Sequence, residues 1–230
     1  MLVIDRLARA AVPLLVAAVA AGCSSGDDDP APDRSLINVN EMRGALLQAA
    51  EIGPTWQAPD ASSDPNRLVS ICGGTATAPP VPPGATVVTA PFVDEGDAGA
   101  QTLEQTALIY ADRSGADAGS AGLRAVADKC PRTASVPATV NAEKSEPAYT
   151  ETVAVQPLNR RAWAGFVVIR HKEYEKAHPG AADTAVAVLA NRNVVLVDAY
   201  AIYLLGAASS GSQFSADWQK LVGTVVNRVG

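Results

Sequence analysis

Apolar residues recur every three or four positions in three stretches of the chain, which is the spacing of helices with one buried face. These stretches cover residues 38–53, 114–130 and 212–230. Asn38 and Ser114 stand near the starts of the first two and are residue types that cap helix N-termini. We therefore expect two helices in the first half of the chain and an amphipathic helix at its end.

The second half of the chain is rich in Val, Thr, Ile and Tyr, which favour strands. Four such runs lie at residues 149–158, 163–170, 184–190 and 194–205. Two of the connections between them are short, polar and contain Asn, which tolerates the left-handed backbone of antiparallel hairpins. An earlier run, residues 100–111, is ambiguous, but its second half favours a strand.

These elements together predict an α+β fold. Because consecutive strands are joined by hairpins, the sheet should be mostly antiparallel, with about five to six strands and three helices packed on one face. Residues 55–91 are rich in Pro, Gly, Ser and Asp, so we expect an extended, irregular stretch there.

The run 194–205 is apolar at both odd and even positions, whereas a sheet covered on one face should alternate apolar and polar residues. Two explanations stay open. The Pro-rich segment folds over the second face, or that face is a concave apolar surface for a small hydrophobic molecule, a lipid or a protein partner. The candidate ligand-binding residues are Tyr200, Tyr203, Trp163 and Asp198. For Asp198, pairing with an arginine such as Arg170 or Arg161 is the simpler expectation.

The N-terminus has the layout of a signal peptide over residues 1–22, with Arg6 and Arg9 ahead of the uncharged run 10–22. Small residues precede Cys23, as in a lipobox, where the thiol is diacylated and the leader is removed. We therefore expect Cys23 to anchor the chain to the extracytoplasmic side of the cell membrane. The alternative is cleavage at a nearby Ala-x-Ala site, with Cys23 incidental.

Residues 23–36 are small, acidic and interrupted by Pro, which predicts a flexible tether. This leaves residues 37–230 as a single domain. The net charge of the chain is −6. Because an acidic surface is repelled by nucleic acid and by anionic lipid, neither is an expected partner, and we assign membrane attachment to the lipid on Cys23.

Cys72 and Cys130 remain as an even pair in a chain expected to be exported, so a disulfide is the predicted state. Closing a loop of this length stabilises a fold by roughly 4 kcal/mol in the chain-entropy model. The alternative is two free thiols. A C-x-x-C motif is absent from the sequence, and thiol–disulfide catalysis is not indicated.

No pattern in the sequence predicts catalysis, a metal or a cofactor. His171 and His178 lie in a charged segment whose spacing fits a solvated loop better than a metal site. Residues 209–211 lack the nucleophile-elbow pattern and fit the cap of the last helix. Phosphate-binding and dinucleotide-binding glycine patterns are absent. Two roles are open for the three tryptophans, which are an aromatic binding platform or packing in the core or at its rim. They are Trp56, Trp163 and Trp218.

Several segments resemble one known family. They are NEMRGALLQAAEIGPTW (residues 40–56), the Cys72 region, ALIYADRSGADAGSAGLRAVADKCP (107–131), WAGFVVIR (163–170) and NRNVVLVDAYAIYLL (191–205). The chain resembles actinobacterial lipoproteins that share the extracellular sensor domain of PknH-type receptor serine/threonine kinases. The resemblance implies a mixed sheet with helices on one side and a ligand-binding cleft. Those kinase domains carry two disulfides, and this chain has cysteines for one.

The function we expect is that of a non-enzymatic, lipid-anchored, sensor-like domain. It would bind a small hydrophobic or cell-envelope ligand, or a partner protein. A lipid carrier is the alternative, and it requires a closed apolar cavity. A cell-wall-acting enzyme is a third hypothesis, with Asp198, His171 and His178 as its candidate residues.

Overall fold

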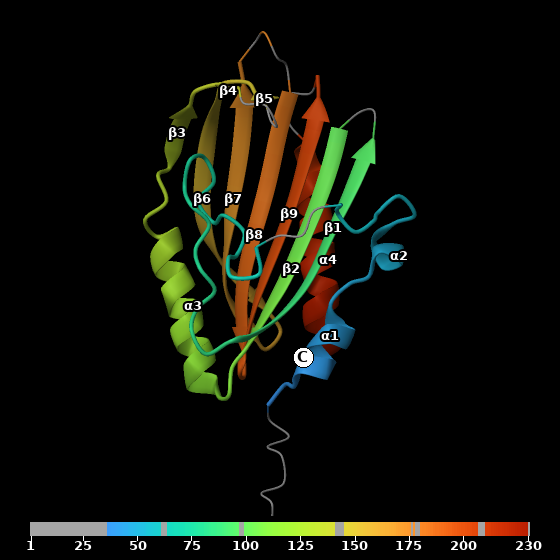
Figure 1. Cartoon of the computed structure of the whole chain (residues 1–230), viewed down its shortest axis with the longest axis vertical. Coiled ribbons are helices and arrows are strands. Elements are labelled where there is room, and N and C mark those ends of the chain that lie inside the picture. Colours follow the sequence, from blue (N-terminus) through green and yellow to red (C-terminus); the bar gives the residue numbers. More distant parts are fainter. Residues whose placement is uncertain are drawn as a thin grey trace, which may run out of the picture. The chain divides into compact units, whose positions relative to one another are not determined.

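A seven-stranded antiparallel sheet forms the centre of the structure (Figure 1). The computed structural model describes residues 36–60, 64–96, 99–140, 145–175, 177, 180–206 and 210–229. From one edge to the other, the strands are β1 (Thr86–Gly96), β2 (Gly99–Ile109), β9 (Val194–Leu205), β8 (Gly180–Asn191), β7 (Trp163–Tyr174), β6 (Tyr149–Arg160) and β3 (Thr133–Val136). A separate two-stranded sheet pairs β4 (Thr139–Val140) with β5 (Ser145–Glu146).

The helices lie on both faces of the large sheet. Helices α1 (Val39–Ala45) and α4 (Gly211–Val229) pack on one face, and the short α2 (Ala49–Ile52) follows α1. Helix α3 (Arg113–Ala127) packs on the other face, against β7, β8 and β9. Figure 1 shows α4 behind the sheet. The predictions of about five to six strands and of three helices on one face were therefore wrong, while the antiparallel sheet is confirmed.

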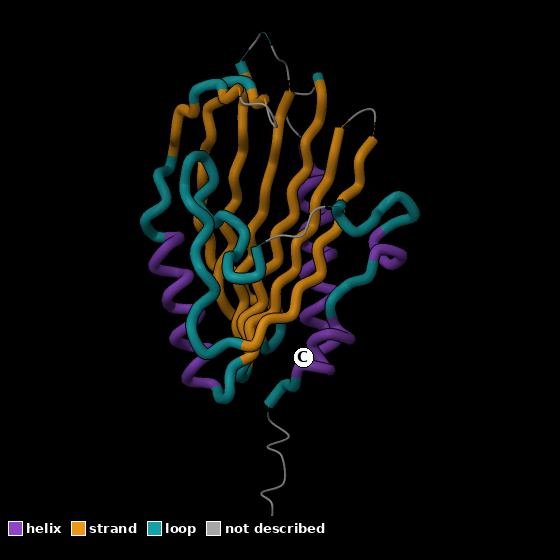
Figure 2. Tube along the Cα trace, in the orientation of Figure 1, coloured by secondary structure: helices purple, strands orange, loops and turns teal. Residues whose placement is uncertain are grey.

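Two apolar cores explain why β9 is apolar on both sides. Alternate residues such as Leu196 and Tyr200 pack with α1 and α4, and their neighbours Val195 and Val197 pack with α3. Leu68 and Ile71 of the segment between α2 and β1 also belong to the second core. Figure 2 shows this segment as a loop in front of the sheet. The first explanation, that the Pro-rich segment covers the second face, is thus correct for part of that face.

Strand β1 lies inside the stretch that we expected to be irregular. Pro91 sits within it, and Pro cannot donate to a strand ladder. Val93, two residues later, bonds to Gln57 on the side away from β2, so the nitrogen of Pro91 also faces away from β2 and the missing N–H costs no bond to that strand. Pro157 in β6 is tolerated in the same way, since β3 pairs with β6 only from Tyr149 to Thr152.

Two hairpin turns place arginine rather than asparagine in left-handed backbone. The φ angle is 53° both at Arg161, between β6 and β7, and at Arg192, between β8 and β9. The side chain of Asn193 instead fastens the start of the described chain. It accepts a hydrogen bond from the Ile37 backbone N–H (2.8 Å) and donates to the backbone oxygens of Ile37 (3.0 Å) and Tyr110 (2.8 Å).

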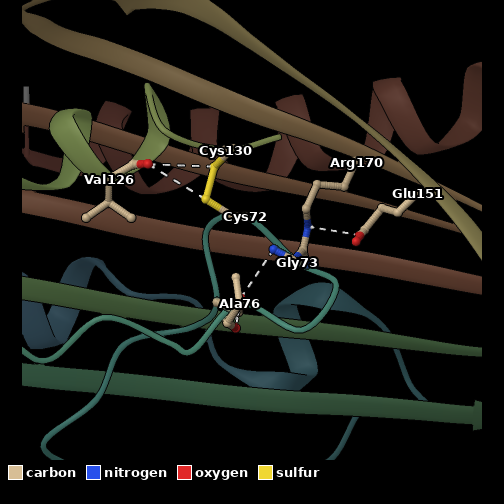
Figure 3. The surroundings of a disulfide bond; sticks show 8 residues. Cys72, Gly73, Ala76, Val126, Cys130, Glu151 and Arg170 are labelled. Carbon is tan, nitrogen blue, oxygen red and sulfur yellow. Dashed lines mark hydrogen bonds and ion pairs between the residues drawn. A yellow bond between two sulfur atoms is a disulfide. The ribbon is translucent and has the colours of Figure 1, made fainter. Parts of the chain in front are cut away.

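The predicted disulfide is confirmed. Cys72 and Cys130 are bonded, with their Cα atoms 5.0 Å apart, so the alternative of two free thiols was wrong. The bond ties the loop before β1 to the turn that follows α3 (Figure 3).

The predicted signal peptide, Cys23 and the tether up to residue 35 lie outside the described residues. Their roles remain predictions. Within the described ranges, the helices are too short or too polar to cross a bilayer.

Candidate functional site

A hollow of about 340 Å³ lies on the face of the sheet that also carries α3. We call it the sheet hollow. Four strands supply its floor and the loop from Ser70 to Ala76 supplies one wall. The floor residues are Arg170, Lys172 and Tyr174 of β7, Ala182 and Thr184 of β8, Ala201 and Tyr203 of β9, and Ala100 and Thr102 of β2.

The hollow exists because small side chains follow large ones along the same face. On β8, the core residues Val186 and Val188 give way to Thr184 and Ala182. On β9, Val197 gives way to alanines in the same direction. Since α3 packs only on the valine-rich part, the alanine- and threonine-lined part is left uncovered by the helix.

Tyr174 and Tyr203 line this uncovered part, and Tyr149 packs against Tyr174. The rings of Tyr174 and Tyr203 meet edge to face with centroids 5.7 Å apart, and those of Tyr149 and Tyr174 are 5.6 Å apart. The Tyr174 hydroxyl donates to Glu146 Oε1 (3.1 Å). Burial, and then the Glu146 carboxylate, raises the pKa of Tyr174, so this hydroxyl remains a donor at neutral pH. The aromatic wall is therefore held in place by ring packing and by one carboxylate.

Lys172 carries positive charge into the hollow. Its Nζ donates to Glu146 Oε1 (2.7 Å) and lies 4.2 Å from the centre of the Tyr149 ring. Both contacts fix the position of the ammonium group. A ligand carboxylate or phosphate at this edge would share this oriented ammonium group with the Glu146 carboxylate.

Arg170 and Glu151 form a buried ion pair under the loop wall, as Figure 3 shows. Arg170 is 9 % exposed and Glu151 is 1 % exposed, and the Arg170 Nε lies 3.8 Å from Glu151 Oε1. Neither Glu151 oxygen accepts a hydrogen bond from any described residue. Burial lowers the pKa of Arg170, while the Glu151 carboxylate opposes that shift. The pair is thus incompletely satisfied at the floor of a hollow.

The hollow continues toward β1 as a second depression of about 300 Å³. Thr102, Thr184, Ala201 and Arg170 line both, so the two form one surface across β7, β8, β9 and β2. Glu104 lies in the second depression, and burial raises its pKa. Of these two depressions, Lys172 lines only the first and Glu104 only the second, while Arg170, paired with Glu151, lines both.

Of the four predicted ligand-binding residues, the structure places only Tyr203 in the sheet hollow. Trp163, Tyr200 and Asp198 point to the opposite face, toward α1 and α4. Trp163 is 0 % exposed, and Tyr200 stacks on Phe214 and donates to Gln101 Oε1 (2.6 Å). The two other tryptophans also pack against this core.

Asp198 pairs with an amide rather than with Arg170 or Arg161. It is 2 % exposed and accepts a hydrogen bond from Gln105 Nε2 (2.6 Å). Gln105 Oε1 in turn accepts from the Leu47 backbone N–H (2.9 Å). Burial raises the pKa of Asp198 to about 7, although the Gln105 hydrogen bond acts in the opposite direction. This carboxyl group lies on the face away from the sheet hollow.

The histidine candidates form no catalytic arrangement within the described part of the chain. His171 Nδ1 lies 2.7 Å from Asp183 Oδ1, and the Ser210 hydroxyl and backbone N–H both bond to Asp183 Oδ2. The hydroxyl thus donates to a carboxylate and not to the imidazole, so it is not activated as a nucleophile. The cluster orients the residue that precedes α4. His178 lies outside the described residues.

Lys172 and Tyr174 were not among the predicted site residues, because the predicted strand ended at Arg170, whereas β7 continues to Tyr174. The signal was present in RHKEY, where Arg170, Lys172 and Tyr174 alternate with residues of the other face. The charged side chains led us to predict a solvated loop where the strand continues along a polar hollow.

Comparison with solved structures finds the extracellular domain of PknH from Mycobacterium tuberculosis, with a TM-score of 0.50 and 17 % sequence identity. The match covers 84 % of this chain and 98 % of that domain. No protein-family model and no curated protein matches the chain. The structural likeness shows that this chain shares the fold of the PknH extracellular domain.

Proposed function

We propose that this protein is a lipid-anchored, extracytoplasmic binding domain that holds a small cell-envelope molecule in the sheet hollow without transforming it. The sheet hollow carries this proposal. Its volume of about 340 Å³ lies in the range of small-molecule sites. It also combines tyrosine rings with the side chains of Lys172 and Arg170, which Glu146 and Glu151 hold in place, so it offers an aromatic surface and fixed polar groups that could orient a ligand.

The lining favours a ligand with two parts. Ala182, Ala201 and Thr184 leave a shallow floor against which a ring or short chain can lie beside Tyr203. Lys172 would then meet an anionic group at the edge. A sensor-like role accords with the fold shared with the PknH extracellular domain.

The two other functions fit this surface less well. A lipid carrier would enclose its cargo in an apolar cavity, whereas Lys172, Arg170 and Thr184 make the walls of this hollow polar. Catalysis would require an activated nucleophile or a pair of matched acids in the hollow. The Ser210 hydroxyl is instead engaged by Asp183, and Asp198 is on the other face.

The anchor is proposed from the lipobox-like residues before Cys23. Intact mass of the chain extracted from membranes tests it. The expected species starts at Cys23 and carries acyl chains, and Cys23→Ser releases the protein from the membrane fraction. An unmodified chain that begins at Met1 in the cytosol would contradict the proposal.

The binding proposal is tested by filling the hollow. Ala182→Trp places an indole on its floor, and Ala154→Trp places the same group on an exposed position of β6 outside it. Thermal unfolding is measured for both variants and for the unmodified chain, with and without fractionated envelope extract.

A fraction that contains the ligand should raise the unfolding temperature of the unmodified chain and of Ala154→Trp, because a ligand that binds only the folded state stabilises it. Ala182→Trp should show no such rise. Equal rises in all three proteins would place the binding site elsewhere, and no rise with any fraction would contradict binding.

A further inference from the structure

A second hollow, of about 530 Å³, lies at the end of the strands opposite the sheet hollow. We call it the arginine hollow. Arg113 at the start of α3, Arg124 further along α3 and Arg192 in the β8–β9 turn line it. The β6–β7 turn contributes Ala162 to the wall and carries Arg161 beside it. Several arginines from three separate elements thus gather at one end of an acidic chain.

Most of these cations lack protein partners. Arg124 donates to Asp128 (2.8 Å) and lies 5.3 Å from the centre of the Phe166 ring. By contrast, the guanidinium groups of Arg113 and Arg192 form no hydrogen bond or ion pair with any described residue. One carboxylate, Asp117, lines the hollow, so three arginines outnumber it. The hollow is therefore a site of local positive charge with capacity to bind an anion.

The backbone of the two turns supports a role for the arginine side chains. Arg161 and Arg192 both have φ of 53°, a conformation that Gly or Asn adopts at lower cost. Neither residue is required there by core packing, since Arg161 is exposed and Arg192 half-buried. Arginine thus occupies two turn positions at which Gly or Asn would cost less, and its side chain extends from both turns at this end of the sheet.

The chain enters the domain at the same end. Asn193, next to Arg192, holds Ile37 through two hydrogen bonds, and Figure 1 shows the described chain beginning near the lower ends of the strands. The segment between Cys23 and Leu36 spans at most roughly 45 Å when fully extended. A lipid on Cys23 would therefore hold the domain within that distance of the bilayer, through a connection that joins the domain at this end.

We propose that the arginine hollow binds the anionic head groups of membrane phospholipids and so docks the domain on the bilayer with the sheet hollow facing outward. The net charge of −6 describes the whole chain and does not exclude this, because exposed charges act over about one Debye length, roughly 10 Å. The proposal is independent of the ligand of the sheet hollow. The acidic tether residues are the competing occupant, and the test includes them.

The test uses the chain from residue 23 onward with Cys23→Ser, so that no acyl chain contributes to binding. Co-sedimentation of this protein is measured with two kinds of vesicle. One kind is phosphatidylcholine alone, and the other contains equal parts of phosphatidylcholine and phosphatidylglycerol. The protein should bind the anionic vesicles, and added salt should weaken that binding.

Arg113→Gln combined with Arg192→Gln should reduce binding to the anionic vesicles roughly 25-fold, at about five-fold for each arginine near the surface. The matched control removes the same charge at the other end of α3, through Lys129→Gln and Arg132→Gln, which are exposed. The control should change binding less than about three-fold. Thermal unfolding of both double variants verifies that they are folded.

Three results would overturn the proposal. They are equal binding to neutral vesicles, an equal loss in both double variants, and tight binding of inorganic phosphate without any preference for anionic vesicles. A fourth concerns the tether. If vesicle binding appears only after Asp27, Asp28 and Asp29 are changed to Asn, the tether occupies the arginines and the proposal is wrong.

Discussion

Gly73 occupies a position in the loop wall where the chain passes directly over the buried Arg170–Glu151 pair. Its φ is +70°, in the left-handed region that favours glycine. A Cβ at this position would overlap the Glu151 carboxylate and the Arg170 guanidinium group. The disulfide at the adjacent Cys72 fixes the loop at this height. One residue without a side chain thus permits the loop to cover the ion pair and to form the wall of the sheet hollow.

Gly73→Ala should therefore destabilise the protein in two ways. The left-handed backbone at this position disfavours alanine, and the added Cβ overlaps the Arg170–Glu151 pair. Gly84→Ala is the matched control, because Gly84 has φ of +82° and a Cβ there would meet no atom within 4 Å. We expect a loss of about 1 to 2 kcal/mol for Gly84→Ala and about 2 kcal/mol more for Gly73→Ala, which also separates a buried pair. Urea unfolding measures both. Equal losses would contradict the close packing of Gly73.

Asp198 should make the stability depend on pH in an unusual direction. Its pKa rises from 3.8 to about 7 on folding because the carboxyl group is buried. Between these values the folded state keeps a proton that the unfolded state releases, so this group lowers stability as pH rises from 3.8 to about 7. Above that window the full cost of a buried charge remains.

Asp198→Asn should remove that cost, because an amide oxygen can still accept the hydrogen bond from Gln105. The difference in unfolding free energy between the variant and the original chain should be about 2 to 4 kcal/mol more favourable to the variant at about pH 8 than at about pH 4. Asp60→Asn, at an exposed position, serves as the control for the substitution itself. Parallel profiles for Asp198→Asn and the original chain would show that Asp198 is ionised in both states.

At the scale of elements, α3 approaches the end of β2 through two glycines. A Cβ on Gly119 would overlap the hydroxyl of Tyr110, and one on Gly115 would lie 3.0 Å from the Tyr110 Cβ. Tyr110 is itself buried in the second core. The helix therefore lies against the tyrosine ring, and this contact sets its distance from the sheet.

Alanine at two positions of α3 should change stability in opposite directions. Gly122→Ala should stabilise by about 1 kcal/mol, since Gly122 is exposed in the helix interior and its Cβ would meet no atom within 4 Å. Gly119→Ala should destabilise by about 1 to 3 kcal/mol, because the helix must move away from Tyr110. Thermal unfolding of the two variants measures the difference. A gain in both would mean that α3 can shift without cost.

The elements predicted well from the sequence are those that the local spacing of apolar residues defines. The period of α4 and the hairpins of β6 to β9 follow directly from the spacing of apolar residues. The two-sided apolar pattern of β9 also indicated correctly that both faces are covered in part. Strand β1 was missed because Pro91 is permitted by its edge position, which only the strand order reveals.

The candidate site was predicted less completely, for a related reason. The apolar and aromatic pattern of the strands indicated Tyr203, but it indicated Tyr200 and Trp163 equally, and these two face the other core. Alternate residues of a strand face opposite sides of the sheet, which separates the residues of the hollow from those of the other core. Which side each helix covers depends on where α3 and α4 pack. The Arg170–Glu151 pair and the loop above it arise from contacts between distant segments, which no local pattern contains.

At the scale of the whole molecule, the two hollows lie at opposite ends of the same strands. β9 runs from Val194, near the arginine hollow, to Tyr203 in the sheet hollow, a distance of roughly 30 Å in an extended strand. An anchor at the first end would present the sheet hollow to the space outside the membrane. The disulfide and the two cores give this arrangement a fixed frame.

The central claim is that the sheet hollow holds a ligand, and native mass spectrometry of protein purified from envelopes under gentle conditions tests it most directly. The unmodified chain and Ala154→Trp should retain a bound small molecule, seen as a constant added mass that disappears on denaturation. Ala182→Trp should be purified without it. The same added mass on Ala182→Trp, or none on any of the three proteins, would contradict the claim.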